Sequence, residues 1–220
     1  MAETIAAVVL AAGNSRRMGR PKALLEYRGK LFIENICASL RAAGVERRIV
    51  VLGRDASAIT SAWKPSDEEV VVNPDPDLGQ LSSLRAGLAA IPSGSGGFMV
   101  CLVDQPTILP ETYSSIINFW RLSSGAIVIP RCLRGLLPAS HPAATGPAAA
   151  DRPFKRGHPI IIPAAYRQLC FDGPLDNGLH WVTHHPSVKV LDLEVADSGI
   201  VMDFDTPQQY EGLRGGGVEG

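Results

Sequence analysis

The chain has 220 residues, a formal net charge of -1 and 45% hydrophobic residues, which suits one large domain. This balanced charge excludes binding of long nucleic acids as a main function, because such binding needs a strongly basic surface. No apolar run has the length of a membrane span, and the acidic N-terminus leads directly into a strand-like stretch rather than a signal peptide. Four scattered cysteines without a CxxC pair indicate free thiols. We therefore expect a cytoplasmic protein.

Strand-like and helix-like segments alternate along the chain. Runs of β-branched and apolar residues predict strands, and apolar residues at helical spacing predict helices. The expected strands cover residues 4–10, 48–52, 69–72, 98–103, 126–129, 159–162 and 188–193. The expected helices cover residues 31–43, 81–91, 110–122 and 163–169, and two more begin near residues 55 and 206. This alternation predicts a three-layer α/β fold with a mostly parallel, twisted, Rossmann-like sheet, whose site lies beyond the carboxyl ends of the strands.

One long segment interrupts the alternation. Residues 133–156 are rich in Ala and Pro and show no periodicity. A loop of this length inside a compact domain is either a functional lid or a disordered segment. We expect a mobile insert within a single domain of residues 1–220, which ends in a flexible tail over residues 214–220.

A glycine-containing basic loop follows the first strand, with the sequence LAAGNSRRMGRPK over residues 10–22. Small residues let backbone N–H groups approach a phosphate closely, and Arg16, Arg17, Arg20 and Lys22 add four cations. The spacing matches neither the P-loop GxxxxGK[ST] nor the dinucleotide fingerprint GxGxxG. The residues alone fit a phosphate-binding loop and a solvated basic turn equally well.

This loop resembles the signature LAAGxSxRMGxxK of the nucleotidyltransferases that activate molybdopterin, in particular the molybdenum cofactor cytidylyltransferase branch. The resemblance implies that the loop wraps a nucleoside triphosphate and that Arg17 and Lys22 neutralise its charge. It implies a nucleotidyltransferase type of Rossmann-like sheet. The residues of the loop that it assigns to the nucleotide are Leu10, Ala11, Ala12, Gly13, Ser15, Arg17, Met18, Gly19 and Lys22.

A second block, Asn-Pro followed by LGQLSSLRAGL, opens the helix near residue 81. Serines at a helix start commonly cap backbone N–H groups, and this role is expected here. The block also resembles the family pattern NP…GMSSSLRAGL. This resemblance implies that Gly79, Ser82 and Ser83 contact the nucleotide, although the Gln-Leu pair between them departs from the pattern.

Two aspartates are candidate metal ligands. Asp104 ends a buried strand in the motif LVDQP, and Asp205 precedes a Thr-Pro helix start in the segment MDFDTP. Oxygen ligands suit Mg²⁺, although aspartates at such positions also serve as simple helix caps. The motifs resemble the family elements LVDQP and DIDTPEDY. The resemblance implies that Asp104 and Asp205 hold the metal, with Asp203 in reserve.

The segment RGHPI over residues 156–160 resembles the RGHPVLF element of the molybdopterin branch. A lone histidine in a loop is more often structural than functional. The resemblance nevertheless implies that the acceptor is bound here, and it assigns four residues to that role. These are Gln105, Pro106, Gly157 and His158.

Five such blocks follow one another in family order from residue 8 to residue 210. They imply a Mg²⁺-dependent enzyme, with Mn²⁺ as an alternative, in which Arg17, Lys22 and Asp104 are catalytic. It would transfer CMP from CTP to the terminal phosphate of the molybdopterin-type molybdenum cofactor and release pyrophosphate. Ala12 favours the cytidylyl branch, since guanylyl-transferring relatives resemble LAGG at this point. The acceptor phosphate is mostly dianionic near neutral pH, so no general base is required.

Other functions remain open at this point. One is guanylyl or cytidylyl transfer to another phosphorylated acceptor, such as a sugar or polyol phosphate. Another is a non-catalytic carrier of the molybdenum cofactor, and a third is a nucleotide-sensing domain. The resemblance further implies a monomer that hands its product to a molybdenum hydroxylase or to the chaperone of that enzyme.

Overall fold

A twisted sheet of eight strands forms the centre of the protein, as seen in a computed structural model that describes residues 4–123, 125–138, 141 and 153–215. The strands follow the order β10-β7-β9-β6-β1-β4-β5, and β8 pairs with β7. Their bounds are β1 (Ile5–Ala11), β4 (Arg47–Leu52), β5 (Glu69–Val72), β6 (Gly97–Leu102), β7 (Ile127–Leu133), β8 (Phe154–Arg156), β9 (Ile160–Pro163) and β10 (Val190–Glu194). Only β8 and β9 pair in antiparallel fashion within the described part of the sheet, so the predicted mostly parallel sheet is confirmed.

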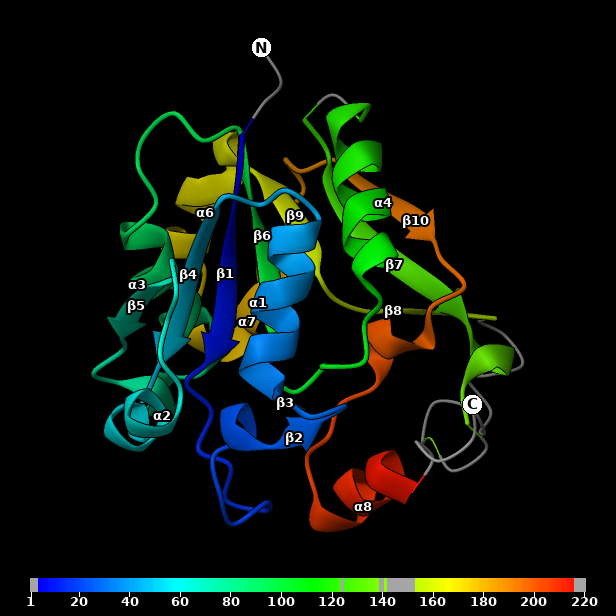
Figure 1. Ribbon diagram of the computed structural model, residues 1–220. Coiled ribbons are helices and arrows are strands. Elements are labelled where there is room, and N and C mark those ends of the chain that lie inside the picture. Colours follow the sequence, from blue (N-terminus) through cyan, green and yellow to red (C-terminus); the bar gives the residue numbers. More distant parts are fainter. Residues whose placement is uncertain (1–3, 124, 139–140, 142–152, 216–220) are drawn as a thin grey trace.

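Helices cover both faces of this sheet and make three layers (Figure 1). One face packs against α1 (Phe32–Ala42), α2 (Ala56–Ala62) and α4 (Pro110–Arg121). The other face packs against α3 (Gln80–Ala89), α6 (Arg167–Asp172) and α7 (Gly178–Thr183). Successive strand residues point to opposite faces, so Ala7 and Val9 of β1 belong to the first core while Val8 and Leu10 belong to the second. All seven residues of β1 are buried.

Several short elements were not expected from the sequence. A hairpin of β2 (Glu26–Tyr27) and β3 (Lys30–Leu31) precedes α1. Its turn uses positive φ angles of 52° at Arg28 and 74° at Gly29. Strand β8 and helix α7 were not expected either. At six residues the helix is too short to show a clear helical period.

The two ends of the predicted insert carry regular secondary structure, which the sequence did not indicate. Strand β7 continues beyond the expected end to Leu133 because β8 pairs with it, with Leu133 opposite Phe154. A 3₁₀ turn, η3 (Arg134–Leu136), follows directly. The expected helix over residues 163–169 is in fact η4 (Ala164–Tyr166) followed by α6. Residues 139–140 and 142–152 of the insert and 216–220 of the predicted tail lie outside the described residues.

The last helix, α8 (Pro207–Gly215), includes the first two residues of the predicted tail. A small third core joins this helix to the start of α1. Phe32 packs edge-on against Phe204 and Tyr210, with ring centroids 6.1 and 5.9 Å away. This contact holds the segment around residue 205 beside the loop that follows β1.

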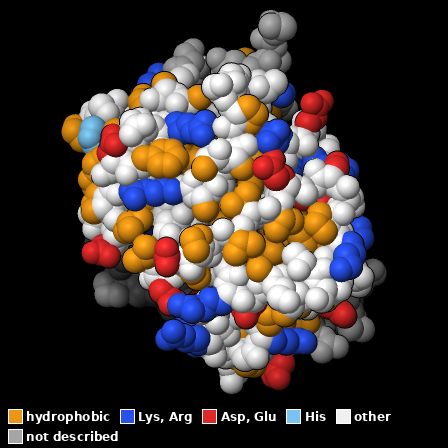
Figure 2. Space-filling model, turned by 90° about the vertical axis from the view of Figure 1, so that its left-hand side faces the viewer, with side chains coloured by type: hydrophobic (Ala, Val, Ile, Leu, Met, Phe, Trp, Pro, Cys, Tyr) orange, Lys and Arg blue, Asp and Glu red, His pale blue; other side chains and the backbone are white. Residues whose placement is uncertain are grey.

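The surface around β5, α2 and α3 shows charged side chains of both signs scattered among hydrophobic ones (Figure 2). Among the described residues, none of the helices combines the length and the apolar character needed to cross a bilayer.

Candidate nucleotide and acceptor sites

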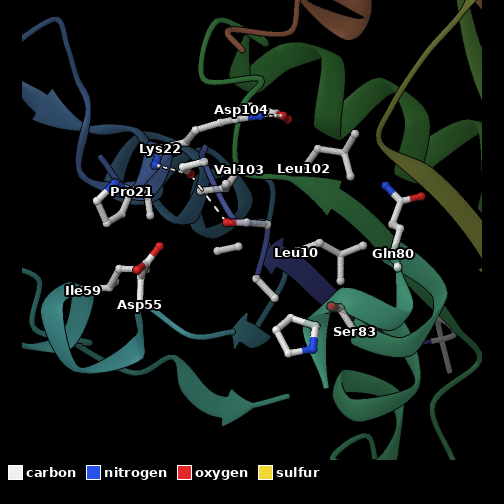
Figure 3. Close-up of a pocket in the computed structure, with 17 residues that line it drawn as sticks. Leu10, Pro21, Lys22, Asp55, Ile59, Gln80, Ser83, Leu102, Val103 and Asp104 are labelled. Atoms are coloured by element: carbon white, nitrogen blue, oxygen red, sulfur yellow. Dashed lines mark hydrogen bonds and ion pairs between the residues drawn. The ribbon is translucent and has the colours of Figure 1, made fainter. Parts of the chain in front are cut away.

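A cavity of about 260 Å³ opens beyond the carboxyl ends of β1 and β6, where parallel α/β sheets place their sites (Figure 3). Lys22 and Asp104 lie at one end of this nucleotide cavity and Ser83 lies at the other. The residues predicted to bind nucleotide that line it are Leu10, Ala11, Ala12, Gly13, Ser15, Lys22, Gly79 and Ser83. Further residues line the cavity that the motifs did not assign to it, namely Pro21, Ala23, Asp55, Ile59, Pro76, Gln80, Leu102 and Val103. Of these, Leu102 is the last residue of β6 and lies within the strand predicted over residues 98–103.

The loop after β1 is folded back on itself. The Ser15 carbonyl accepts hydrogen bonds from the backbone N–H groups of Met18 and Gly19, each at 3.0 Å. The Ser15 hydroxyl accepts another from the backbone N–H of Lys22 at 3.1 Å. Gly19 adopts φ 74°, a conformation that favours glycine. These bonds place Lys22 at the wall of the cavity.

Met18 has a different role from the predicted one. Its side chain is 7% exposed and packs in the small core with Leu25, Phe32, Phe204 and Tyr210. It therefore anchors the loop to the rest of the protein instead of facing the nucleotide cavity. Gly19 shapes the same loop without lining the cavity.

A second, open cleft of about 550 Å³ adjoins the nucleotide cavity on the side of the basic loop. Gly13, Ser15 and Lys22 line both spaces. Arg16 and Arg17 line only the cleft, so the cations of the loop gather outside the cavity. This basic cleft is a suitable place for the phosphates of a nucleotide whose base lies in the cavity.

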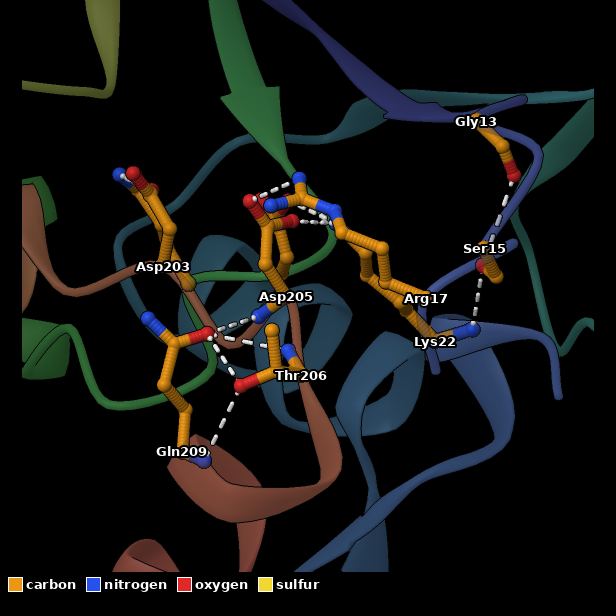
Figure 4. A network of polar contacts seen from close by, with 10 residues as sticks. Gly13, Ser15, Arg17, Lys22, Asp203, Asp205, Thr206 and Gln209 are labelled. Atoms are coloured by element: carbon orange, nitrogen blue, oxygen red, sulfur yellow. Dashed lines mark hydrogen bonds and ion pairs between the residues drawn. The ribbon is translucent and has the colours of Figure 1, made fainter. Parts of the chain in front are cut away.

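Four charged side chains meet where the cavity joins the basic cleft (Figure 4). Lys22 Nζ lies 2.7 Å from Asp104 Oδ2 and also pairs with Asp205 Oδ1. Arg17 donates to the other oxygen of Asp205 at 2.7 Å. The structure therefore brings together four residues that are up to 188 positions apart and that belong to three separate sequence motifs.

Mutual attraction within this group determines how its members titrate. Burial by itself would lower the pKa of Lys22, but Asp104 and Asp205 outweigh burial and hold that pKa above its ordinary value. Burial would likewise raise the pKa of Asp205, yet Lys22 and Arg17 keep it below its ordinary value. The lysine is therefore protonated and Asp205 is ionised at neutral pH.

Asp203 provides a third carboxyl group next to the pair. Its Oδ1 accepts a hydrogen bond of 2.7 Å from Gln105 Nε2, and burial followed by the nearby charge of Asp104 raises its pKa. The backbone N–H of Phe204 donates to the Asp104 carbonyl at 3.1 Å, which ties this segment to the end of β6. Oxygen donors of this kind are what Mg²⁺ and Mn²⁺ prefer, so Asp104 and Asp205 fit the predicted metal.

The start of α3 forms the far wall of the cavity. Gly79 precedes the helix with φ 94°, which only glycine adopts readily. Asn73 Nδ2 donates to the hydroxyls of Ser82 at 2.9 Å and Ser83 at 3.1 Å. Ser82 in turn donates to the Asp75 carbonyl, so its side chain supports the loop and does not line the cavity, in contrast to the prediction.

A polar contact missed by the sequence analysis joins the two loops that border the cavity. Asn14 Nδ2 donates to Asp77 Oδ1 at 2.5 Å, and Arg54 pairs with the other oxygen of Asp77. No motif signals this contact, because its members lie on three separate loops.

A larger, more open pocket of about 840 Å³ lies on the other side of Gly79 and Gln80, which line both spaces. Gly157 and His158, two of the predicted acceptor-binding residues, line this second pocket. His180 of α7 and His184, the residue directly after that helix, line it as well, with their rings stacked at 3.8 Å between centroids. Their i, i+4 spacing in the sequence is the signal that could have identified them.

The other two predicted acceptor residues are not in this pocket. Gln105 and Pro106 are buried, and Gln105 Nε2 donates to the Ile200 carbonyl at 3.2 Å. The backbone N–H of His158 donates to the same carbonyl at 2.9 Å. Gln105 therefore supports the loop that carries His158, which corrects its predicted role as a direct ligand.

Gly157 must be glycine for steric reasons, because a Cβ atom there would lie 2.0 Å from the Ile200 carbonyl oxygen. The neighbouring His158 is half-buried, and the removal of its ring from water lowers its pKa to about 4. Its Nε2 is inaccessible to solvent and has no hydrogen-bond partner among the described residues. The imidazole at the wall of the second pocket is therefore neutral at pH 7.

Comparison with known proteins agrees with this arrangement. Residues 7–187 match the family model described as MobA-like NTP transferase domain. A probable molybdenum cofactor guanylyltransferase of Opitutus terrae is 33% identical over 159 residues, which cover 71% of this chain and 75% of that protein. Nicotine blue oxidoreductase of Paenarthrobacter nicotinovorans is 32% identical over 167 residues, which cover 74% of this chain and 72% of that protein.

The crystal structure of Rv0371c from Mycobacterium tuberculosis H37Rv has the same fold, with a TM-score of 0.78 and 30% identity. The alignment covers 97% of this chain and 98% of that one. Rv0371c is also known as a complex with manganese. The match over most of the chain and the shared fold lead to one conclusion: the chain belongs to the family of MobA-like NTP transferases, and it is a nucleotidyltransferase by fold and family.

Proposed function

We propose that the protein transfers CMP from CTP to the terminal phosphate of the molybdenum cofactor and releases pyrophosphate. The observation that carries this proposal is the meeting of Lys22, Asp104, Asp205 and Arg17 between the nucleotide cavity and the basic cleft. In the reaction, an oxygen of the acceptor phosphate forms a bond to the α-phosphorus of the triphosphate. The bond from that phosphorus to the α–β bridging oxygen breaks, and pyrophosphate leaves with the electron pair.

The main task of the protein in this reaction is to bring two polyanions together. Arg17 and Lys22 would neutralise the β- and γ-phosphates and the departing pyrophosphate. Asp104 and Asp205 would hold Mg²⁺, or Mn²⁺ as in the known complex of Rv0371c. The bound metal supplies charge neutralisation and orientation of the phosphates. No side chain needs to act as a base, because the acceptor phosphate is already ionised.

Cytidine is the proposed base because the loop has alanine at position 12, where guanylyl-transferring relatives resemble LAGG. Ala12 lines the cavity, so a change at this position alters the wall that a base would contact. Ala12 is itself confined, since a Cβ atom at Gly53 would lie 2.6 Å from its carbonyl oxygen. GTP is the second candidate, because the relative from Opitutus terrae is named as a guanylyltransferase.

The pocket beside His158 is the proposed acceptor site. It is separate from the nucleotide cavity, and the two spaces meet at Gly79 and Gln80. The His158 ring at its wall is neutral at pH 7, because its pKa is lowered to about 4, so this part of the pocket can accept an uncharged ring of the acceptor. The stacked rings of His180 and His184 give this pocket a flat aromatic wall.

Several finer features are part of the same proposal. All four cysteines are buried free thiols, which suits a reducing cytoplasm. We expect a monomer that delivers its product to a molybdenum hydroxylase or its chaperone.

A carrier without catalysis, or an enzyme for another phosphorylated acceptor, would use the same two spaces. A redox role like that named for the relative from Paenarthrobacter nicotinovorans would leave the paired Lys22, Asp104 and Asp205 without a function.

Pyrophosphate release tests the proposal. The protein is incubated with Mg²⁺ and molybdenum cofactor together with CTP, GTP or ATP in parallel. We expect release with CTP to exceed release with GTP by at least about 10-fold, a factor that one small change in pocket size can produce. A preference for GTP would move the protein to the guanylyl branch. Release from none of the three would contradict transfer to this acceptor.

A further inference from the structure

Lys22 occupies the place between two carboxylates that a divalent metal would require. Its ammonium group contacts Asp104 Oδ2 at 2.7 Å and pairs with Asp205 Oδ1, so one cation neutralises both proposed metal ligands. An ammonium group and a metal ion that use the same carboxylate oxygens compete with each other. The nucleotide-free protein therefore already contains a cation at this point.

We propose that Lys22 is a built-in counter-cation that must leave Asp104 and Asp205 before a divalent metal binds there, so that metal and triphosphate bind cooperatively. This inference rests on the proposed function, because it assumes that the two aspartates are the metal ligands. It adds an order to the binding events.

The surroundings of Lys22 provide a second position for its ammonium group. Lys22 lines both the nucleotide cavity and the basic cleft that contains Arg16 and Arg17. Apart from Asp205, the carboxylate that lines this cleft is Asp77, and it already pairs with Arg54 and accepts a hydrogen bond from Asn14. A triphosphate in the cleft would offer Lys22 an anionic partner, and the flexible four-carbon stem of lysine allows the exchange.

The ion pairs of Lys22 with Asp104 and Asp205 are partly shielded from solvent, so they can compete with a divalent metal for these carboxylates. The side chains of Lys22, Asp104 and Asp205 are only 16%, 20% and 29% exposed, respectively. Salt screens such partly buried pairs less than it screens pairs on the open surface. Arg17, with a side chain that is 69% exposed, contacts only one oxygen of Asp205 and competes less strongly.

Thermodynamic linkage gives the expected size of the coupling between metal binding and triphosphate binding, and it requires the coupling to be the same in both directions. Couplings between two sites typically change affinity by about 5- to 150-fold, and each ligand strengthens the other by the same factor. In the absence of nucleotide, the protein should bind metal weakly because Lys22 must be displaced without compensation.

Binding of Mn²⁺ to the nucleotide-free protein tests this inference by titration calorimetry. Lys22→Met should bind Mn²⁺ at least about 10-fold more tightly than the unaltered protein, within the usual range of couplings. Lys30→Met is the matched control, since Lys30 is an exposed lysine on β3, and its affinity should not change. Equal or weaker binding by Lys22→Met, or no binding by either protein, would overturn the inference.

A second measurement uses the unaltered protein and so does not depend on the folding of a variant. Reductive methylation followed by peptide mass analysis reports how accessible the Lys22 amine is. Saturating Mg²⁺ should increase methylation of Lys22 and leave Lys30 unchanged, whereas an unchanged Lys22 would contradict displacement. Neither experiment contains nucleotide or acceptor, so each can fail while pyrophosphate release succeeds, and the reverse also holds.

Discussion

Lys22, Asp104 and Asp205 show how single residues far apart in the chain are positioned for one task. Asp104 lies just beyond β6, and Lys22 opens the short 3₁₀ helix η1 (Lys22–Leu24) after the basic loop. The packing of the neighbouring Phe204 against Phe32 holds Asp205 in place. The three side chains are therefore positioned by three different parts of the fold, so each side chain can be substituted separately.

Substitution at this group should affect turnover strongly. Loss of one preorganised electrostatic contact typically lowers the rate by about 10²–10³-fold, and we expect at least this loss for Asp104→Ala and for Lys22→Ala. Initial rates of pyrophosphate release with CTP and molybdenum cofactor measure it. Lys30→Ala, which removes an exposed lysine outside the site, should keep the normal rate. Near-normal turnover of either site variant would show that the group is not catalytic.

At the scale of elements, the sheet and the helix α3 determine the shape of the nucleotide cavity. α3 approaches β1 and β4 closely at Gly87, where a Cβ atom would lie 2.5 Å from Val8 Cγ1 and 2.8 Å from Val51 Cγ2. The helix start at Gly79 and Gln80 is thereby fixed between the two pockets. A larger residue at position 87 would push the helix away from the sheet.

Gly87→Ala should therefore destabilise the protein in spite of the better helix propensity of alanine. Overpacking of a tight core contact typically costs about 1–3 kcal/mol. Gly212→Ala in α8 is the control, because a Cβ atom there has no neighbour within 4 Å. That change should leave stability equal or raise it by up to about 1 kcal/mol. Urea denaturation measures both variants, and a Gly87→Ala protein as stable as the unaltered one would contradict the tight packing.

The sequence predicted most helices and strands well, because the hydrophobic pattern that identifies each of them lies within the element itself. The strands at residues 69–72 and 48–52 and the helix starting at Pro110 match the structure closely. Elements that depend on a distant partner were missed. Strand β8 exists because β7 is beside it, and the ordered ends of the insert follow from that pairing.

The residues of the candidate site were likewise predicted in part correctly and in part not. Lys22, Asp104 and Gly79 belong to motifs and lie where the motifs predict, beside the cavity. The side chains of Met18 and Gln105 belong to motifs too, yet they support loops from inside the protein. A motif identifies which residues are constrained, and only packing distinguishes a residue that faces the ligand from one that holds the loop.

At the scale of the whole molecule, two spaces share one border. The nucleotide cavity lies beyond the ends of β1 and β6, the pocket beside His158 lies past Gly79 and Gln80, and the basic cleft adjoins the first. A nucleotide in one space and an acceptor in the other would lie next to each other across this border. This arrangement suits an enzyme that joins two bound molecules, and it is more than a carrier of one molecule would need.

Mass analysis of the product tests this central claim most directly. Excess protein is mixed with CTP, Mg²⁺ and molybdenum cofactor in a single turnover, with Asp104→Asn as the inactive control. We predict one new species, the cofactor joined to CMP through a pyrophosphate linkage, together with one equivalent of free pyrophosphate. Unmodified cofactor beside intact CTP, or hydrolysis of CTP without a joined product, would contradict the account.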